Sequence, residues 1–252
     1  MITLYSFPQS RSLRAAWTLE ELGLEYQCQH VALDKGEGQT AEHLARHPDG
    51  KVPVMVDGDI QLFESAPICR YLADTYGDGT LLPSDPAARA QVDQWLSFII
   101  TEIEQPLWNQ AKHKFALPQD RRVPAILPVC AWEFQRALSA LERRHNGQAT
   151  LVGTTFTLAD LFLTHTLSWA VSMKHRLPEP LQVYRKRHTQ RPAMAKAIEK
   201  SRRPQRAEGS LKSQAHQAGR LPDPVLPLRP PCFGLPAAHY AVWRVHLDHL
   251  QS

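Results

Sequence analysis

The chain has 252 residues, of which 43% are hydrophobic and 21% are charged, and its formal net charge is +4. The length favours two domains, or one domain with extensions, and no run approaches the roughly 20 apolar residues of a membrane helix. Residues 201–252 hold seven Lys and Arg against three Asp and Glu, which leaves 22 of each in residues 1–200, and a neutral body without a basic stripe argues against nucleic-acid binding.

The cysteines and the N-terminus indicate the compartment. Cys28, Cys69, Cys130 and Cys232 lie far apart without a Cys-x-x-Cys pair, which argues against a disulfide framework and against a zinc site. The first residues lack the basic region and apolar run of an exported precursor. We therefore expect a cytoplasmic protein with reduced thiols and no metal.

The first 33 residues predict a strand, a helix and a second strand. Ile2 to Phe7 alternates and ends at a proline, and apolar residues recur at helical spacing between Leu13 and Gly23. Residues 26–33 are typical of the second strand, and a loop over 34–39 and a short helix over 40–47 follow. Either Ser10 or Ser12 is expected to cap the first long helix, a role that by itself contributes about 1 kcal/mol and no chemistry.

A β-hairpin is predicted at residues 52–63. Two β-rich runs, 52–56 and 60–63, flank Asp57-Gly58, a dipeptide that strongly favours a hairpin turn. Pro53 has no N–H for the ladder, so it belongs on an edge, at a bulge or at a cis bond. The sequence predicts an open edge, where the backbone of Val52 pairs with an extended peptide as an added strand.

A helix is predicted from Ser65 to Gly77. Pro67 lies in its first turn, and a glycine closes it. The free first-turn amides and the positive end of the helix dipole favour a bound carboxylate, and Ser65 adds a hydroxyl. One stretch therefore predicts a peptide-pairing strand beside a carboxylate site.

These motifs resemble the glutathione-binding half of the glutathione S-transferase family. The shared features are the Val-Pro strand, the Asp-Gly hairpin and Glu64-Ser65 at a helix start, and Ser10-x-x-x-Arg14 resembles the bacterial and fungal serine-type members. The resemblance implies a thioredoxin-like α/β N-terminal domain followed by an all-α helical-bundle domain. It also implies a homodimer that uses glutathione as cosubstrate and attacks small, hydrophobic electrophiles.

The resemblance also implies roles for single residues. Pro53 is then cis, Val52 pairs with the cysteinyl part of glutathione, and Glu64 and Ser65 receive its γ-glutamyl end. Ser10 contacts the sulfur as the catalytic residue. A hydroxyl donor at a helix N-terminus would lower the thiol pKa from its usual value of about 8.5.

Four further positions are less well defined. Ser12 is the alternative candidate for the contact with the glutathione sulfur that is assigned to Ser10. Lys51 is expected near a glutathione carboxylate or its backbone, and Lys35 near the glycine carboxylate. His47 stands where many relatives have asparagine in an Asn-Pro-x-Gly-Lys-Val-Pro pattern, so that this chain departs from the family there.

Beyond a linker at residues 78–85, only helices are expected. One runs over 86–113, where Pro106 bends or interrupts it, and another over 123–144. Thr157 and Asp160 form a variant capping box for a helix that ends near residue 173, a structural role rather than a catalytic one. Short helices over 179–188 and 192–200 follow. The predicted organisation is a glutathione-binding domain at 1–78, a helical domain at 86–200 and a Pro/Arg-rich, largely disordered tail at 201–252.

Substrate choice and the tail stay open at this point. The candidates for lining an electrophile pocket are Phe7, Trp108, His113 and Phe115, but aromatic side chains on amphipathic helices are more often part of the core. The alternatives to conjugation are a non-catalytic binding or assembly module, and a glutathione-dependent isomerase, dehalogenase or peroxidase. In the tail, residues 240–250 suggest a short helix, and His246 with His249 is weak evidence for a metal site.

Overall fold

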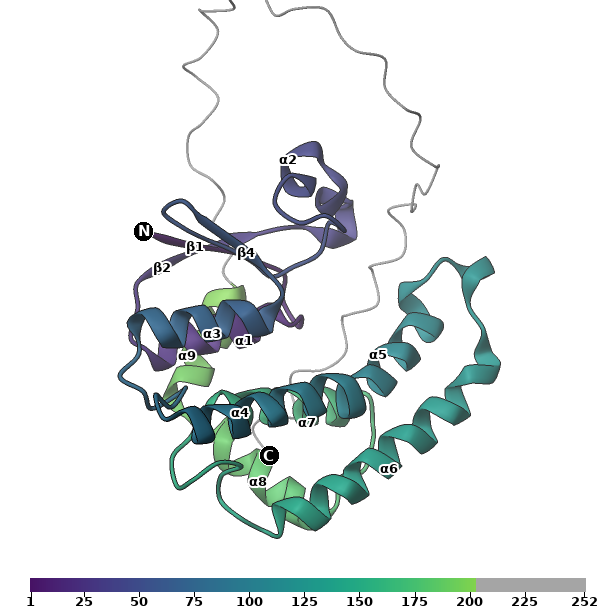
Figure 1. The fold of residues 1–252 in the computed structure, drawn as a ribbon. Helices are drawn as coiled ribbons and strands as arrows, with labels where there is room; N and C mark the ends of the chain where they lie inside the picture. The colour runs from purple at the N-terminus through teal and green to yellow at the C-terminus, as the bar shows by residue number, and fades with distance from the viewer. Residues whose placement is uncertain (203–252) are drawn as a thin grey trace, which may run out of the picture.

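A four-stranded mixed sheet forms the N-terminal part of the protein, whose residues 1–202 are described by a computed structural model (Figure 1). The strand order is β2-β1-β3-β4. Strand β1 (Ile2–Ser6) runs parallel to β2 (Tyr26–His30) and antiparallel to β3 (Val54–Asp57), which pairs antiparallel with β4 (Ile60–Phe63). Alternate residues of β1 are buried, as its sequence pattern predicts.

The position of Pro53 corrects one expectation. The Val52–Pro53 peptide bond is cis, but β3 lies between β1 and β4, so the predicted open edge is wrong. The ladder begins at Val54, which pairs with Tyr5 and Phe63. Pro53 therefore precedes the paired residues, and the sheet does not need its missing N–H.

Three helices accompany the sheet. Helices α1 (Ser12–Glu21) and α3 (Ser65–Tyr76) pack together between the sheet and the helical domain, and the short α2 (Ala41–Leu44) lies on the other side of the sheet (Figure 1). The second strand ends at residue 30, earlier than predicted, because the chain then forms two 3₁₀ turns, Leu33–Lys35 and Glu37–Gln39.

The predicted long helix over 86–113 is interrupted. Helix α4 (Pro86–Phe98) continues into a π-helical turn, η3 (Ile99–Glu104), before α5 (Gln105–Ala111). Pro106 lies in the first turn of α5, where its missing N–H is tolerated, and the wider turn lies directly before it. The remaining elements of this arm are a second π-helical turn, Lys112–Ala116, the 3₁₀ turns Gln119–Arg121 and Pro124–Ile126, and α6 (Leu127–His145).

The last three described helices close the body. Helix α7 (Leu158–Ser172) is buried along most of its length, and α8 (Glu179–Thr189) packs against it. Helix α9 (Pro192–Arg202) returns to the first domain, where it packs on α1 and β2. A single hydrophobic core therefore runs through both domains, with Trp17 of α1 fully buried in it.

Three expectations lie beyond this description. The disordered tail predicted over 201–252, from residue 203 onward, the predicted helix over 240–250 and the histidine pair at 246 and 249 fall outside the described residues. Within residues 1–202, no helix is long and apolar enough to cross a membrane.

Candidate functional site

Ser10 lies in the turn that leads into α1. Its Oγ accepts a hydrogen bond from the Ser12 amide (3.1 Å) and donates one to the Phe7 carbonyl (2.6 Å). The N-cap residue of α1 is Arg11, so the prediction that Ser10 or Ser12 is the N-cap is off by one residue. The Ser10 hydroxyl nevertheless accepts a hydrogen bond from the first amide of the helix, that of Ser12. Ser10 is partly exposed and Ser12 is buried. Of the two hydroxyls, the Ser10 hydroxyl is therefore the more accessible to a ligand.

Glu64 and Ser65 stand at the start of α3. Glu64 is its N-cap and has a positive φ of 69°, an unusual backbone conformation for a residue with a side chain. Its side chain has no capping bond, and the residue is exposed. Ser65 is buried as the first helical residue. The carboxylate of Glu64 thus faces solvent beside a helix N-terminus.

Val52 offers a backbone without a partner. Within residues 1–202, neither its N–H nor its C=O makes a hydrogen bond, because the ladder of β3 begins two residues later. Val52 is half-buried and Pro53 is buried. Although the sheet edge is elsewhere, this backbone is still free to pair with an extended peptide.

His47 links the loop before Val52 to the start of α3. Its Nδ1 accepts a hydrogen bond from the Asp49 amide (3.1 Å), and its ring packs on Phe63 with 5.0 Å between centroids. Burial lowers the pKa of the His47 imidazole, and the nearby Glu64 carboxylate opposes that shift. His47 is thus a buried group close to Glu64, and its burial favours the neutral imidazole.

The two lysines are placed differently. The Lys51 ammonium pairs with Asp49 at 2.5 Å, and the Lys51 carbonyl is 2.9 Å from His43 Nε2, which fixes the loop next to Val52. Lys35 is exposed in the 3₁₀ turn Leu33–Lys35. In the described part of the chain, no hydrogen bond or ion pair joins the Lys35 side chain to the other predicted site residues.

Arg14 connects α1 to α3 and to the helical domain. It donates a hydrogen bond to Ser65 Oγ (3.4 Å) and one to Thr166 Oγ1 (2.9 Å). It also forms an ion pair with Glu104, and both side chains are buried. Burial lowers the pKa of the Arg14 guanidinium, and the Glu104 carboxylate opposes this shift. Arg14 therefore supports the two segments that carry Ser10 and Ser65.

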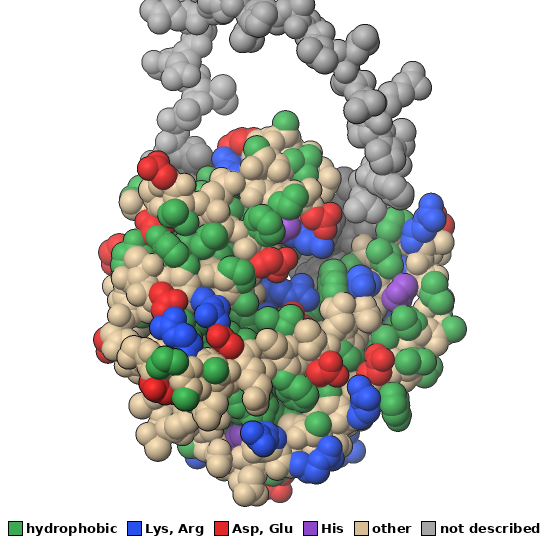
Figure 2. Space-filling model, in the orientation of Figure 1, with side chains coloured by type: hydrophobic (Ala, Val, Ile, Leu, Met, Phe, Trp, Pro, Cys, Tyr) green, Lys and Arg blue, Asp and Glu red, His purple; other side chains and the backbone are tan. Residues whose placement is uncertain are grey.

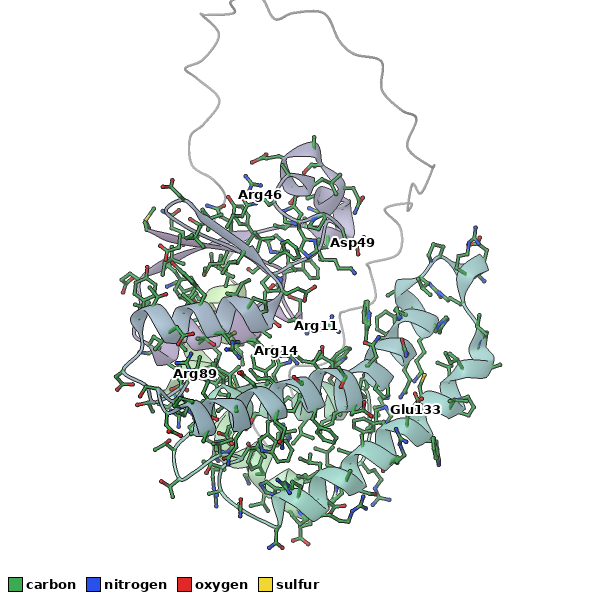
Figure 3. All side chains as sticks on the ribbon, in the orientation of Figure 1. Arg11, Arg14, Arg46, Asp49, Arg89 and Glu133 are labelled. Carbon is green, nitrogen blue, oxygen red and sulfur yellow. The ribbon has the colours of Figure 1, made fainter. Side chains whose placement is uncertain are left out.

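Arg11 completes this network from the neighbouring turn. Its Nε donates to Glu104 Oε1, and its guanidinium lies 5.1 Å from the Trp108 ring centroid and 5.3 Å from that of Trp169. Burial by itself would raise the pKa of the Glu104 carboxyl, but Arg14 and Arg11 hold it at about 2. Figure 3 shows Arg11 and Arg14 where the sheet domain meets the helices.

His165 of α7 touches the backbone of the Ser10 turn. Its Nε2 lies 3.4 Å from the Ser10 carbonyl oxygen. Burial, helped by the charge of Arg14, lowers the pKa of His165 to about 3, so that the ring is neutral and Nε2–H donates to the carbonyl. The helical domain thus fixes the Ser10 turn by a hydrogen bond.

The surface is hollowed between the two domains. In the space-filling view, Lys and Arg, Asp and Glu, and hydrophobic side chains all border this hollow (Figure 2). Among the described residues, no group of three or more His, Cys, Asp and Glu is arranged to hold a metal ion. The N-terminus of α3 and the unpartnered backbone of Val52 suit an anionic or peptide-like ligand.

Three residues that contact Arg14 or the Ser10 turn are not predicted from the sequence, namely Glu104, Arg11 and His165. Glu104 follows the core position Ile103 in an apolar helical run, so periodicity gives no sign of its buried ion pair. Arg11 and His165 carry no motif. The segment Ile99–Glu104 also contains Glu102, which is exposed, so the local sequence does not mark Glu104 as the buried partner of two arginines.

The sheet, the flanking helices and the helical second part define a two-domain protein with a thioredoxin-like N-terminal domain, as predicted. The model of the N-terminal domain of glutathione S-transferases matches residues 1–74. Glutathione S-transferase F10 from Arabidopsis thaliana is 41% identical over 168 residues, which cover 64% of this chain and 77% of that protein. The chain belongs to the glutathione S-transferase family.

Solved structures show the same fold. A glutathione transferase from Methylococcus capsulatus superposes with a TM-score of 0.71 and 29% identity, covering 80% of this chain and 98% of that one. A theta class enzyme from Xanthomonas axonopodis pv. citri, solved with glutathione bound, has a TM-score of 0.69 and 28% identity and covers 78% and 96% of the two chains. The finer assignment to the bacterial serine-type members stays a prediction.

Proposed function

We propose that this protein is a glutathione transferase that activates the glutathione thiol as thiolate for attack on small, hydrophobic electrophiles. The observation that carries this proposal is the bond from Arg14 to Ser65, because it joins the Ser10 turn to the N-terminus of α3. These segments supply a hydroxyl for the sulfur and a site for a carboxylate. Family membership supports the same activity.

Glutathione is expected to bind in an extended conformation along the first domain. Its cysteinyl backbone pairs with the unpartnered Val52 N–H and C=O, which the cis Pro53 follows. Its γ-glutamyl carboxylate meets the first amides of α3 and the Ser65 hydroxyl, and its amino group meets the Glu64 carboxylate. Lys51 and Lys35 are proposed for the other end of the tripeptide.

The nucleophile of the proposed reaction is the thiolate of the bound glutathione. The Ser10 hydroxyl donates a hydrogen bond to the sulfur, and the N-terminus of α1 and the Arg11 charge favour the anion. The thiolate then attacks an electrophilic atom of the second substrate, forming a C–S bond as the leaving group departs. To donate to sulfur, the Ser10 hydroxyl gives up its bond to the Phe7 carbonyl.

The ultraviolet absorbance of the thiolate tests this proposal. Glutathione bound to the native protein is titrated against pH, and the same titration is run with Ser10→Ala and Ser12→Ala. We expect a bound thiol pKa below that of free glutathione, a rise in Ser10→Ala, and little change in Ser12→Ala. A rise only in Ser12→Ala would assign the role to Ser12, and the absence of saturable binding would favour the non-catalytic alternative.

The oligomeric state is proposed on the resemblance alone. We expect a homodimer, in which the first domain of one subunit faces the helical domain of the other. Light scattering that gives a monomeric mass in solution would contradict it. A cytoplasmic location and a role in detoxification also stay predictions.

A further inference from the structure

The Arg11 guanidinium has donors that the protein does not use. Its Nε donates to Glu104, but within residues 1–202 neither Nη1 nor Nη2 has a hydrogen-bond partner. The side chain is 29% exposed, so these N–H groups are accessible from solvent. Two free Nη atoms in one plane match the two oxygens of a carboxylate.

Two indole rings border this cation. Trp108 of α5 and Trp169 of α7 approach the guanidinium from different helices, and their ring centroids are 6.5 Å apart. Both tryptophans are partly exposed. They hold the cation by cation–π attraction and leave apolar surface next to it, which suits a flat hydrophobic body.

The local charge balance favours an anion. Arg11, Arg14 and Glu104 together carry two positive charges and one negative charge, and His165 is neutral because its pKa is about 3. Arg14 is fully buried against Glu104, so the excess charge is available at the exposed Arg11. A partly desolvated positive charge attracts an anion more strongly than it would in open water.

Arg11 also lies next to the proposed sulfur site. It directly follows Ser10, whose carbonyl is held by His165. Figure 3 shows Arg11 at the junction of the two domains, where a second substrate has to approach a thiol held by Ser10. A group bound by Arg11 therefore reaches the same space as the reacting sulfur.

We propose that Arg11 selects electrophiles that carry a carboxylate on a flat aromatic body, with the carboxylate on its free Nη atoms and the body against Trp108 and Trp169. This inference deepens the proposed function and rests on it. It names the preferred class of second substrate, an aromatic carboxylate with a displaceable group.

Two matched probes separate charge from shape, 4-chloro-3,5-dinitrobenzoate and its methyl ester. In both, the glutathione thiolate attacks the ring carbon that bears chlorine, a C–S bond forms, and the C–Cl bond breaks as chloride leaves with the bonding pair. The thiol proton goes to solvent. The carboxylate or ester lies para to the reacting carbon and is not itself changed, but it alters the reactivity of the ring, and dividing by the uncatalysed rate removes this electronic effect.

The measurement is kcat/KM for each probe, divided by the rate constant of its uncatalysed reaction with glutathione thiolate. We expect the native protein to favour the acid by about tenfold or more, the value of one charge-assisted pair of about 1.4 kcal/mol. In Arg11→Gln, kcat/KM for the acid is expected to fall about tenfold more than kcat/KM for the ester, so that the normalised preference becomes about one. The matched control is Arg89→Gln, because Arg89 is 31% exposed and pairs with Asp74 at 2.7 Å, away from the site.

Three results would overturn the inference. One is a native protein that conjugates the ester as well as the acid, which would leave the proposed function standing. Another is that Arg11→Gln lowers kcat/KM equally for both probes and raises the KM for glutathione, which would mean that Arg11 binds glutathione rather than the second substrate. The third is no conjugation of either probe and no glutathione binding, which would remove the proposed function as well.

A variant that fails to fold does not block the test. Non-reactive 3,5-dinitrobenzoate and its methyl ester are then compared as inhibitors of the native, glutathione-loaded protein. The inference requires tighter inhibition by the acid, competitive with the electrophile, and fails if the ester binds equally well.

Discussion

The buried ion pair between Arg14 of α1 and Glu104 of η3 joins two segments that lie 90 residues apart in the chain. Glu104 also forms an ion pair with Arg11, so one carboxylate neutralises part of the charge of two arginines. The π-helical turn that ends at Glu104 brings this carboxylate to the first domain. The pair therefore fixes the site and the domain junction at the same time.

Glu104→Ala is expected to lower the free energy of unfolding by about 3–5 kcal/mol, because it leaves Arg14 buried without its partner. Urea unfolding followed by tryptophan fluorescence measures the change. The control is Glu102→Ala, since Glu102 lies two residues away, is 46% exposed and is 3.5 Å from Arg136, and it is expected to lose about 1 kcal/mol or less. Equal losses in the two variants would contradict a special role of the Arg14–Glu104 pair.

Glu64 combines an unfavourable backbone with an exposed carboxylate. Its φ of 69° suits glycine, so Glu64→Gly is expected to be about 1 kcal/mol more stable than Glu64→Ala, which keeps the strained conformation. Both variants lack the carboxylate proposed to meet the glutathione amino group. Calorimetry should show binding weakened by about tenfold or more in both. Tighter binding in the glycine variant than in the native protein would show that the carboxylate is not used.

Asp160 is expected to matter for stability alone. Its carboxylate accepts hydrogen bonds from the Thr157 amide (2.8 Å), the Leu151 amide (2.7 Å) and the Tyr184 hydroxyl (2.6 Å). Asp160→Asn replaces one acceptor oxygen by a donor, and we expect a loss of about 2–3 kcal/mol in urea unfolding. Glutathione affinity of the folded variant should be unchanged. The exposed Asp120→Asn is the control, with an expected change within about 0.5 kcal/mol.

The sequence predicts those features that neighbouring residues determine together. Thr157 and Asp160 form their capping box within a single turn, and α3 starts at Ser65, where the proline and apolar spacing predict it. The order of strands in the sheet is not determined by neighbouring residues. The residues around Pro53 do not show that β3 pairs with β1 as well as with β4, so their pattern predicts an edge where the structure has an internal strand.

The same reasoning explains the partial prediction of the site. Ser10, Val52, Glu64 and Ser65 can be named as candidates because a helix start, a proline and a hairpin mark their segments and the family resemblance gives them roles, which stay predictions. Glu104 and His165 reach the Ser10 turn only through the packing of α1 against η3 and α7. No short-range pattern contains such a contact, so the charges that surround the proposed thiol become visible only in the fold.

His165 gives the protein a defined response to acid. Its pKa is lowered to about 3 in the folded state by burial, against an ordinary value of 6.5. Above pH 6.5 the ring is neutral in both the folded and the unfolded chain, and its contribution to stability is complete. As the pH falls from 6.5 towards 3, His165 becomes protonated in the unfolded chain but stays neutral in the folded one, so the free energy of unfolding decreases.

His165→Gln is therefore expected to flatten the loss of stability in acid while keeping an N–H for the Ser10 carbonyl. The free energies of unfolding of the native protein and the variant are compared from pH 8 to pH 4. Their difference should be constant above pH 6.5 and change below it by up to about 1.4 kcal/mol per pH unit, in favour of the variant. Parallel curves over the whole range would mean that His165 is protonated as readily in the fold as in the unfolded chain. A neutral, partly buried donor to the Ser10 carbonyl would then be ruled out.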